Sequence, residues 1–199
     1  MKTATRSGVY TFEDFCCLVK DGQKADLING VIYMASPDNM DANDLFIWLA
    51  RLLGDFVEER DLGKIYGSRA AFRLGEKESP EPDIAFVRKD RLHLVQRGFM
   101  DGPPDLALEI VSPESVDRDY ELKREQYRRA GVPEYWIVDE MEQRVTLLRL
   151  TAGGAYREVR PRKGILHSQV VPGFWLRPEW LWQDPLPKKS IVLAELLKD

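Results

Sequence analysis

The sequence has few of the residues that build disulfide frameworks and zinc sites, since it contains only two cysteines and two histidines. The cysteines are the neighbours Cys16 and Cys17, which cannot join distant segments, and His93 stands far from His167. These spacings exclude a zinc finger and a disulfide framework. They fit a reducing compartment, so we expect a cytoplasmic protein.

Long apolar runs are missing as well. No stretch approaches the ~20 apolar residues of a transmembrane helix, so we expect no contact with a membrane interior. The segment Met1–Arg6 is not followed by an apolar signal core, which argues against export. With 199 residues, 44% hydrophobic and 31% charged, the chain has the composition of one globular domain.

An excess of positive charge is also absent, because the formal net charge is −4. Dedicated DNA-binding domains are usually basic, so the sequence does not favour strong nonspecific binding of nucleic acid. Five basic residues lie between Arg118 and Arg129, so positive charge is locally concentrated there, with acids interspersed. A solvated helix face is one interpretation of that segment.

Hydrophobic periodicity and turn residues predict a mixture of helices and strands. The predicted segments are, in chain order, a helix over 11–19 capped by Thr11, a hairpin over 26–34 around Asn29-Gly30, an amphipathic helix over 41–59, strands over 70–74, 83–87 and 105–111, a helix over 117–130, and strands over 135–138 and 145–150. Gly63 and Gly67 are interpreted as breaks between elements. This order predicts an α+β or α/β fold, with a mixed β-sheet flanked by helices.

Three of the five tryptophans lie in the segment 172–182. Closure of the core is one interpretation of this segment, and a dimer interface is the other, because aromatic residues are enriched at interfaces. We expect a single domain over residues 1–199. Its core covers about 10–150, and an aromatic-rich extension covers about 151–199.

Two acids stand at or inside apolar strands. Asp83 begins one strand immediately after Pro82, where an ordinary strand-edge aspartate is the alternative interpretation. Glu109 lies inside a nearly continuous apolar run, on the face that alternation assigns to Ala107 and Val111. An ionised carboxylate there is costly unless it is paired or bound to a metal. A divalent metal together with a lysine can cut phosphodiester bonds.

Segment lengths place Lys123 within reach of Glu109. The strand continues about 13 Å beyond Glu109, and the following helix returns about 9 Å before it reaches Lys123. Tyr120, Lys123 and Tyr127 are spaced three and four apart, so they share one helix face. A surface lysine that extends to solvent is the alternative.

These residues belong to longer motifs: Pro82-Asp83-Ile84-Ala85-Phe86-Val87, then Pro104-Asp105-Leu106-Ala107-Leu108-Glu109-Ile110-Val111-Ser112-Pro113-Glu114-Ser115, then Asp119, Lys123 and Tyr127 before Gly131-Val132-Pro133-Glu134-Tyr135-Trp136-Ile137-Val138-Asp139. With them the chain resembles the Uma-two restriction-endonuclease family, within the PD-(D/E)XK nuclease superfamily, from about Tyr10 to Leu150. The resemblance implies a restriction-endonuclease-like fold. It also implies that Asp83 and Glu109 are metal ligands and that Lys123 is the catalytic lysine.

The chain departs from the family pattern at three positions. The superfamily's usual lysine position is Val111 here, and the family variant takes its lysine from the next helix, at Lys123. Asp26 stands where a glutamate is usual, one methylene shorter. Asn43 stands where a histidine is frequent, and an asparagine cannot act as a general base near pH 7.

The function that the resemblance implies is a metal-dependent endonuclease that hydrolyses phosphodiester bonds of DNA. Asp83 and Glu109, with the carbonyl of Ile110, would hold Mg²⁺ or Mn²⁺, and Asp26 would complete the acidic cluster. A homodimer is expected, because cutting both strands needs two active sites. Two alternatives stay open: a catalytically degenerate nuclease fold that acts as a nucleic-acid-binding or interaction module, and a carboxylate-pair glycosidase, in which Lys123 would have no role.

Overall fold

The computed structural model describes residues 9–20, 22–36 and 39–198, so the segment Met1–Arg6, for which no export signal is predicted, lies outside the described residues. The helical elements are α1 (Phe12–Leu18), α2 (Met40–Glu59), the 3₁₀ turn η1 (Lys89–Leu94), the π-helical η2 (Arg118–Lys123), α3 (Arg124–Ala130), the 3₁₀ turn η3 (Pro178–Trp180) and α4 (Lys189–Leu196). The strands are β1 (Ala25–Ile28), β2 (Val31–Met34), β3 (Gly63–Gly67), β4 (Ala71–Arg73), β5 (Ile84–Arg88), β6 (Phe99–Asp101), β7 (Leu106–Ile110), β8 (Glu134–Asp139), β9 (Arg144–Leu150), β10 (Tyr156–Val159), β11 (Leu166–His167) and β12 (Trp175–Leu176).

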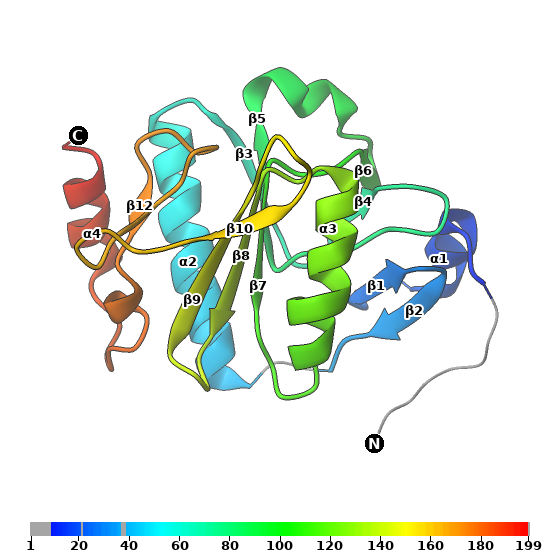
Figure 1. The fold of residues 1–199 in the computed structure, drawn as a ribbon, viewed down its shortest axis with the longest axis horizontal. Coiled ribbons are helices and arrows are strands. Elements are labelled where there is room, and N and C mark those ends of the chain that lie inside the picture. The colour runs from blue at the N-terminus through cyan, green and yellow to red at the C-terminus, as the bar shows by residue number, and fades with distance from the viewer. Residues whose placement is uncertain (1–8, 21, 37–38, 199) are drawn as a thin grey trace.

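A six-stranded mixed sheet runs through the molecule in the order β10-β9-β8-β7-β5-β3 (Figure 1). β7 and β8 are parallel, and the other neighbours are antiparallel. A parallel pair needs a crossover connection, and η2 with α3 supplies it here. The predicted mixed sheet flanked by helices is confirmed.

Helices cover both faces of the central strands. α2 packs on one face, with Leu52 in the same apolar cluster as Ile84 and Leu108. α3 packs on the other face, where Tyr127 lies in a cluster with Ala107 and several neighbours. Burial on both faces explains why β7 reads as a nearly continuous apolar run.

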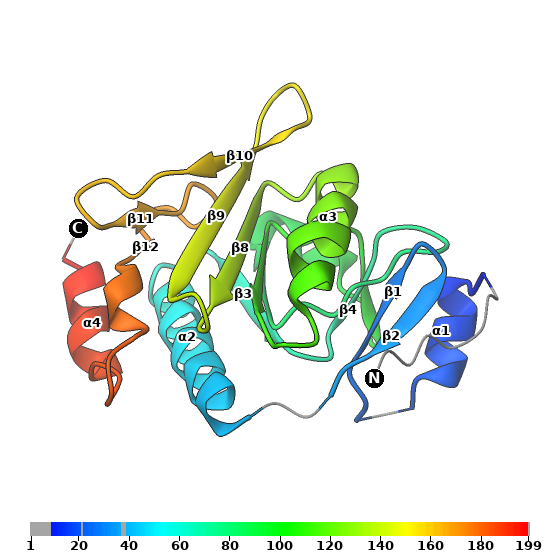
Figure 2. The ribbon, with the colours of Figure 1, turned by 60° about the horizontal axis from the view of Figure 1, so that its bottom comes forward.

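The hairpin of β1 and β2 lies beside α3, apart from the central sheet (Figures 1 and 2). Asn29 and Gly30 have positive φ angles of 50° and 72°, as a tight two-residue hairpin turn of this kind requires. The Gln126 side-chain amide donates a hydrogen bond to the Leu27 carbonyl oxygen at 2.8 Å. This contact holds the hairpin, and with it Asp26, next to the helix that carries Lys123.

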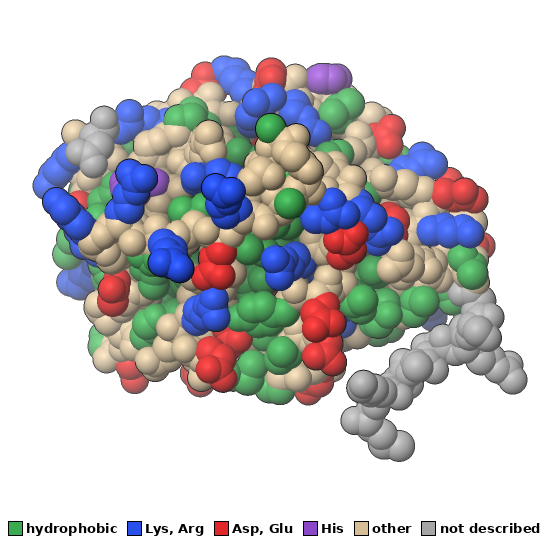
Figure 3. Space-filling view, in the orientation of Figure 1, with side chains coloured by type: hydrophobic (Ala, Val, Ile, Leu, Met, Phe, Trp, Pro, Cys, Tyr) green, Lys and Arg blue, Asp and Glu red, His purple; other side chains and the backbone are tan. Residues whose placement is uncertain are grey.

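On the face shown in Figure 3, the Lys and Arg side chains are spread out with Asp and Glu side chains between them. The described residues therefore do not form one continuous basic surface on that face, in agreement with the net charge of −4. Within residues 9–20, 22–36 and 39–198, no helix combines the length and the apolarity that crossing a membrane requires.

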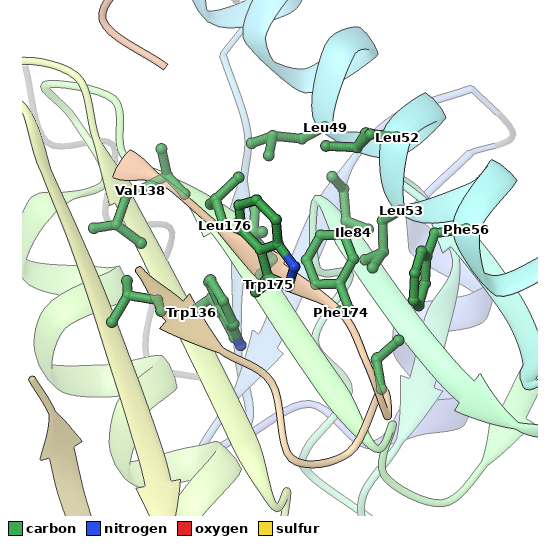
Figure 4. Packing of buried hydrophobic residues seen from close by; sticks show 14 of the residues in the cluster. Leu49, Leu52, Leu53, Phe56, Ile84, Trp136, Val138, Phe174, Trp175 and Leu176 are labelled. Carbon is green, nitrogen blue, oxygen red and sulfur yellow. The ribbon is translucent and has the colours of Figure 1, made fainter. Parts of the chain in front are cut away.

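The C-terminal aromatic segment closes the core on the α2 side of the sheet. Trp175 and Trp180 are buried, and Phe174 meets Phe56 of α2 with ring centroids 5.4 Å apart. Figure 4 shows Phe174 and Trp175 among the labelled side chains of α2 and the sheet. Core closure is thus confirmed for this segment, whereas its role in a dimer stays a prediction.

The interpretation of Gly63 and Gly67 as breaks between elements is wrong, because they are the first and last residues of β3. β3 pairs with β5 along its whole length, from Gly63 opposite Arg88 to Gly67 opposite Ile84. At Gly63, where φ is 154°, a Cβ atom would collide with the Val87 carbonyl oxygen. The glycine therefore permits a close approach between strands.

Candidate active site

Two carboxylates meet where β5 begins and β7 ends. Asp83 immediately precedes β5, and the antiparallel pairing of Ile84 with Leu108 places it beside Glu109. The backbone N–H of Ile110 donates to Asp83 Oδ2 at 2.7 Å, and the Asp83 N–H donates a long hydrogen bond to Glu109 Oε2 at 3.4 Å. The fold thus brings the two predicted acids together, with the backbone of Ile110 beside them.

Lys123 reaches both Glu109 and Asp26. Its Nζ lies 2.9 Å from Glu109 Oε1 and 3.0 Å from Asp26 Oδ2. The side chain is only 1% exposed, so the alternative of a surface lysine is wrong. Val111, at the superfamily's usual lysine position, is buried in an apolar cluster. The predicted fold-back of the helix onto its strand is confirmed.

Asp26 approaches the same lysine from the hairpin. It is 1% exposed, and its Oδ1 accepts the backbone N–H of Glu81 at 2.9 Å. Although burial raises the pKa of Asp26, the nearby cations of Lys123, Lys24 and Arg118 hold it below its ordinary value. The shorter side chain at this position therefore still reaches the lysine as a carboxylate.

The helix that carries Lys123 begins with the wide π-helical turn η2. Hydrogen bonds in such a turn join residues five apart, which brings Arg118 and Lys123 onto one side. The predicted shared face is also observed, because the Tyr127 hydroxyl donates to Glu109 Oε1 at 2.7 Å and the Tyr120 hydroxyl to Asp139 at 3.0 Å. The interpretation as a solvated face holds only for the outward residues, of which Glu125 is one.

The charges around Lys123 do not balance. We use the name carboxylate cluster for five carboxyl groups and the three cations that face them. Its members are Asp26, Glu81, Asp83, Glu109 and Asp119, with Lys24, Arg118 and Lys123. If all of them are ionised, two negative charges remain in excess, which equals the charge of one divalent cation.

The carboxylate cluster has the donors that Mg²⁺ prefers. Within the described part of the chain, no three His, Cys, Asp or Glu side chains form a ready-made metal site. Mg²⁺ needs only one or two carboxylates, together with water and substrate phosphate, and Asp83 with Glu109 meets that need. Both line a cavity of about 30 Å³, which has room for a water-sized occupant. The residues present therefore fit a divalent cation.

Burial and neighbouring charges shift the pKa values of groups in the carboxylate cluster. Burial raises the pKa of Glu109 to about 7, although the Lys123 cation opposes the rise. Burial likewise raises the pKa of Glu81 to about 7 and that of Asp119 to about 6. Burial alone would lower the pKa of Lys123, but the carboxylates of Asp26 and Glu109 raise it above its ordinary value. At neutral pH the lysine is charged while several acids still hold part of a proton.

The sequence matches the model of the Uma2 family, described as "Putative restriction endonuclease", over residues 10–179. This match spans most of the 199 residues and includes every member of the carboxylate cluster. The chain belongs to the Uma2 family. No curated protein matches the sequence.

Among solved structures, this Uma2 chain is similar to "a putative nuclease belonging to DUF820" from Anabaena variabilis. The TM-score is 0.72, and the match covers 86% of this chain and 97% of that one. Sequence identity is 17%, so the similarity concerns the fold. Family and fold together indicate a restriction-endonuclease-like nuclease.

The structure of this Uma2 protein places further residues at the candidate site that the sequence did not single out. Lys24 forms an ion pair with Asp83, and the Glu81 carboxylate accepts the backbone N–H of Ala25 at 3.1 Å. A signal for both existed in the sequence. Lys24 lies two residues before Asp26, and Glu81 lies two residues before Asp83. Side chains two residues apart in an extended chain point to the same side, so the two side chains of each pair lie on the same side of the chain.

We expect the metal-free Uma2 protein to lose stability as the pH rises from about 4.5 to 7. Glu109 and Glu81 have folded-state pKa values near 7, above the ordinary 4.5, so the folded state binds their protons more tightly. Their contribution is complete below pH 4.5 and is lost as the pH rises through about 7. Urea unfolding across this range should show a loss on the order of 5 kcal/mol for the two groups together.

Glu109→Gln removes one of these titrating groups and serves as the comparison. Its free energy of unfolding should depend less on pH between 4.5 and 7 than that of the wild type. A wild-type protein that instead becomes more stable over this range would contradict the raised pKa values.

Proposed function

We propose that this protein is a metal-dependent endonuclease that hydrolyses phosphodiester bonds of DNA. The observation that carries the proposal is the position of Glu109, which contacts Lys123 on one side and Asp83 on the other. A buried carboxylate pair with a lysine and an excess of negative charge suits a divalent cation and a phosphate. Membership of the Uma2 family supports the same activity.

Asp83 and Glu109, with the Ile110 carbonyl oxygen, would hold Mg²⁺ or Mn²⁺. When bound, such an ion polarises a scissile phosphate and lowers the pKa of a water molecule. Lys123 carries three N–H donors, of which Asp26 and Glu109 accept two. The third would orient the attacking water and offset negative charge that develops on the phosphate. Asp26 acts through Lys123 by holding its ammonium in place.

The test is cleavage of plasmid DNA by the purified protein with Mg²⁺ or Mn²⁺, and with EDTA. We expect cleavage only with the ion, and a loss on the order of 10³-fold in Asp83→Ala. Asp105→Asn is the matched control, because Asp105 is also buried but precedes β7 at its opposite end, paired with Arg91. This control should retain cleavage.

Two outcomes would count against the proposal. Cleavage that persists in Asp83→Ala would indicate a contaminant or a different site. Binding of DNA without metal-dependent turnover would favour the catalytically degenerate form, a binding module that keeps the nuclease fold.

The proposal includes a homodimer. One carboxylate cluster cuts one strand, so two copies of the chain are needed to cut both strands of a duplex in one binding event. A dimer that cuts in this way converts supercoiled plasmid to the linear form without first accumulating the nicked form.

A further inference from the structure

Two cations of the carboxylate cluster remain within reach of a bound molecule. The Lys24 ammonium pairs with Asp83, and Arg118 Nε lies 3.6 Å from Asp26 Oδ2. Their side chains are 20% and 18% exposed, and both line the cavity, whereas Lys123 is 1% exposed. Lys24 and Arg118 are therefore the cations that stand at the mouth of the cavity.

The Lys24 ammonium forms an ion pair with one carboxylate oxygen of Asp83. Asp83 Oδ2 accepts the Ile110 N–H at 2.7 Å, and Oδ1 carries the Lys24 ammonium. A divalent cation held by the same carboxylate would be repelled by this ammonium, because two positive charges a few ångströms apart destabilise each other. Binding of the ion at Asp83 and pairing of Lys24 with Asp83 are thus in competition.

Arg118 has hydrogen-bonding capacity that the described residues do not use. Its Nε is buried and has no hydrogen-bond partner among them, since the Asp26 oxygen at 3.6 Å is too distant. Buried donors are nearly always satisfied, so one without a partner calls for an explanation. A guanidinium offers several N–H donors in a planar arrangement that matches phosphate oxygens.

We propose that Lys24 and Arg118 form a phosphate-binding pair that is coupled to cation binding at Asp83. In the metal-free protein, Lys24 neutralises Asp83. Once the acids hold a divalent cation, Lys24 no longer has this partner, and its flexible stem turns to a phosphate of the nucleic-acid backbone, which Arg118 also binds. This inference rests on the proposed function, since it names how the same site takes its substrate.

The chemistry of the mouth favours this ligand class. When all five acids are ionised, a divalent cation cancels the excess of two negative charges in the carboxylate cluster, so less negative charge is left to neutralise Lys24 and Arg118. An ammonium beside a guanidinium then suits an anion with several acceptor oxygens, and phosphate is such an anion. Metal and nucleic acid would therefore bind with positive coupling.

The first test measures the affinity for Mn²⁺ by isothermal titration calorimetry, without nucleic acid. Lys24→Gln should bind Mn²⁺ about tenfold more tightly than the wild type, because the competing charge is gone. Lys24→Arg keeps the charge and should stay close to the wild type. Lys64→Gln is the surface control, since Lys64 is exposed on β3, and should change nothing.

The second test measures binding of a fluorescein-labelled DNA duplex by anisotropy, with Ca²⁺ as an oxygen-seeking cation and with EDTA. With Ca²⁺, Lys24→Gln and Arg118→Gln should each bind the duplex about tenfold more weakly than the wild type. With EDTA, Lys24→Gln should bind the duplex about as strongly as the wild type, because in the metal-free wild type Lys24 is paired with Asp83 and does not bind the duplex. Lys24→Met repeats both tests with an apolar stem in case the glutamine variant folds poorly.

The outcomes separate this inference from the proposed function. If Glu109→Gln abolishes Mn²⁺ binding but Lys24→Gln leaves it unchanged or weaker, the inference is wrong and the proposed function stands. If the wild type binds no Mn²⁺, both are wrong. Equal effects of Lys24→Gln on DNA binding with Ca²⁺ and with EDTA would show that no coupling exists.

Discussion

Lys123→Met is expected to abolish cleavage and to lower the free energy of unfolding by about 3–5 kcal/mol. Lys123 is 1% exposed and pairs with Asp26 and Glu109 at 3.0 and 2.9 Å. Methionine has a similar length but no charge, so two buried carboxylates would lose their main cation. The activity loss should be on the order of 10³-fold or more, because the donor near the phosphate is removed.

Urea unfolding and plasmid cleavage, measured on the same preparation, check both parts of this prediction. Lys64→Met is the matched control, since the same substitution at an exposed position of β3 should affect neither quantity. Part of the lost stability should return as the pH falls below about 7, where Glu109 takes up a proton. A Lys123→Met protein as stable as the wild type at pH 7 would show that the ion pairs contribute nothing.

Glu109→Gln should separate activity from stability. The carboxylate has a pKa raised to about 7, so at neutral pH it is costly to keep ionised. Glutamine still accepts the Tyr127 hydroxyl hydrogen bond that now reaches Glu109 at 2.7 Å. We therefore expect little change in the free energy of unfolding, but a loss of Mn²⁺ binding and a drop in cleavage on the order of 10³-fold.

Glu134→Gln provides the control for this second substitution. Glu134 is also a buried strand glutamate, 0% exposed, but it lies on β8 and pairs with Arg149 at 3.0 Å. It also accepts hydrogen bonds from Ser168 and from the backbone of Gln169. Its replacement should lower stability and leave the Mn²⁺ affinity unchanged. Mn²⁺ binding that survives in Glu109→Gln would refute the assignment of this residue as a ligand.

Much of the fold was predictable because local patterns carry it. The leucine spacing predicted α2, Asn29-Gly30 predicted the hairpin turn, and alternation placed Glu109 on the face that α3 covers. Gly63 was misinterpreted because its role depends on the approach of Val87 from another strand. Hydrophobic periodicity describes one segment at a time and does not identify the strand or helix that packs against that segment.

The sequence by itself indicated that Glu109 lies on a buried strand and that Lys123 could reach it, because both follow from residue pattern and spacing within one strand–helix unit. Only the tertiary structure decided that Lys24 pairs with Asp83 and that Asp26 shares Lys123, since these contacts join the hairpin to the sheet and to the helix. Such long-range contacts depend on the packing of whole elements. In a chain with 29 basic and 33 acidic residues, the sequence contains too many alternative pairs to reveal them.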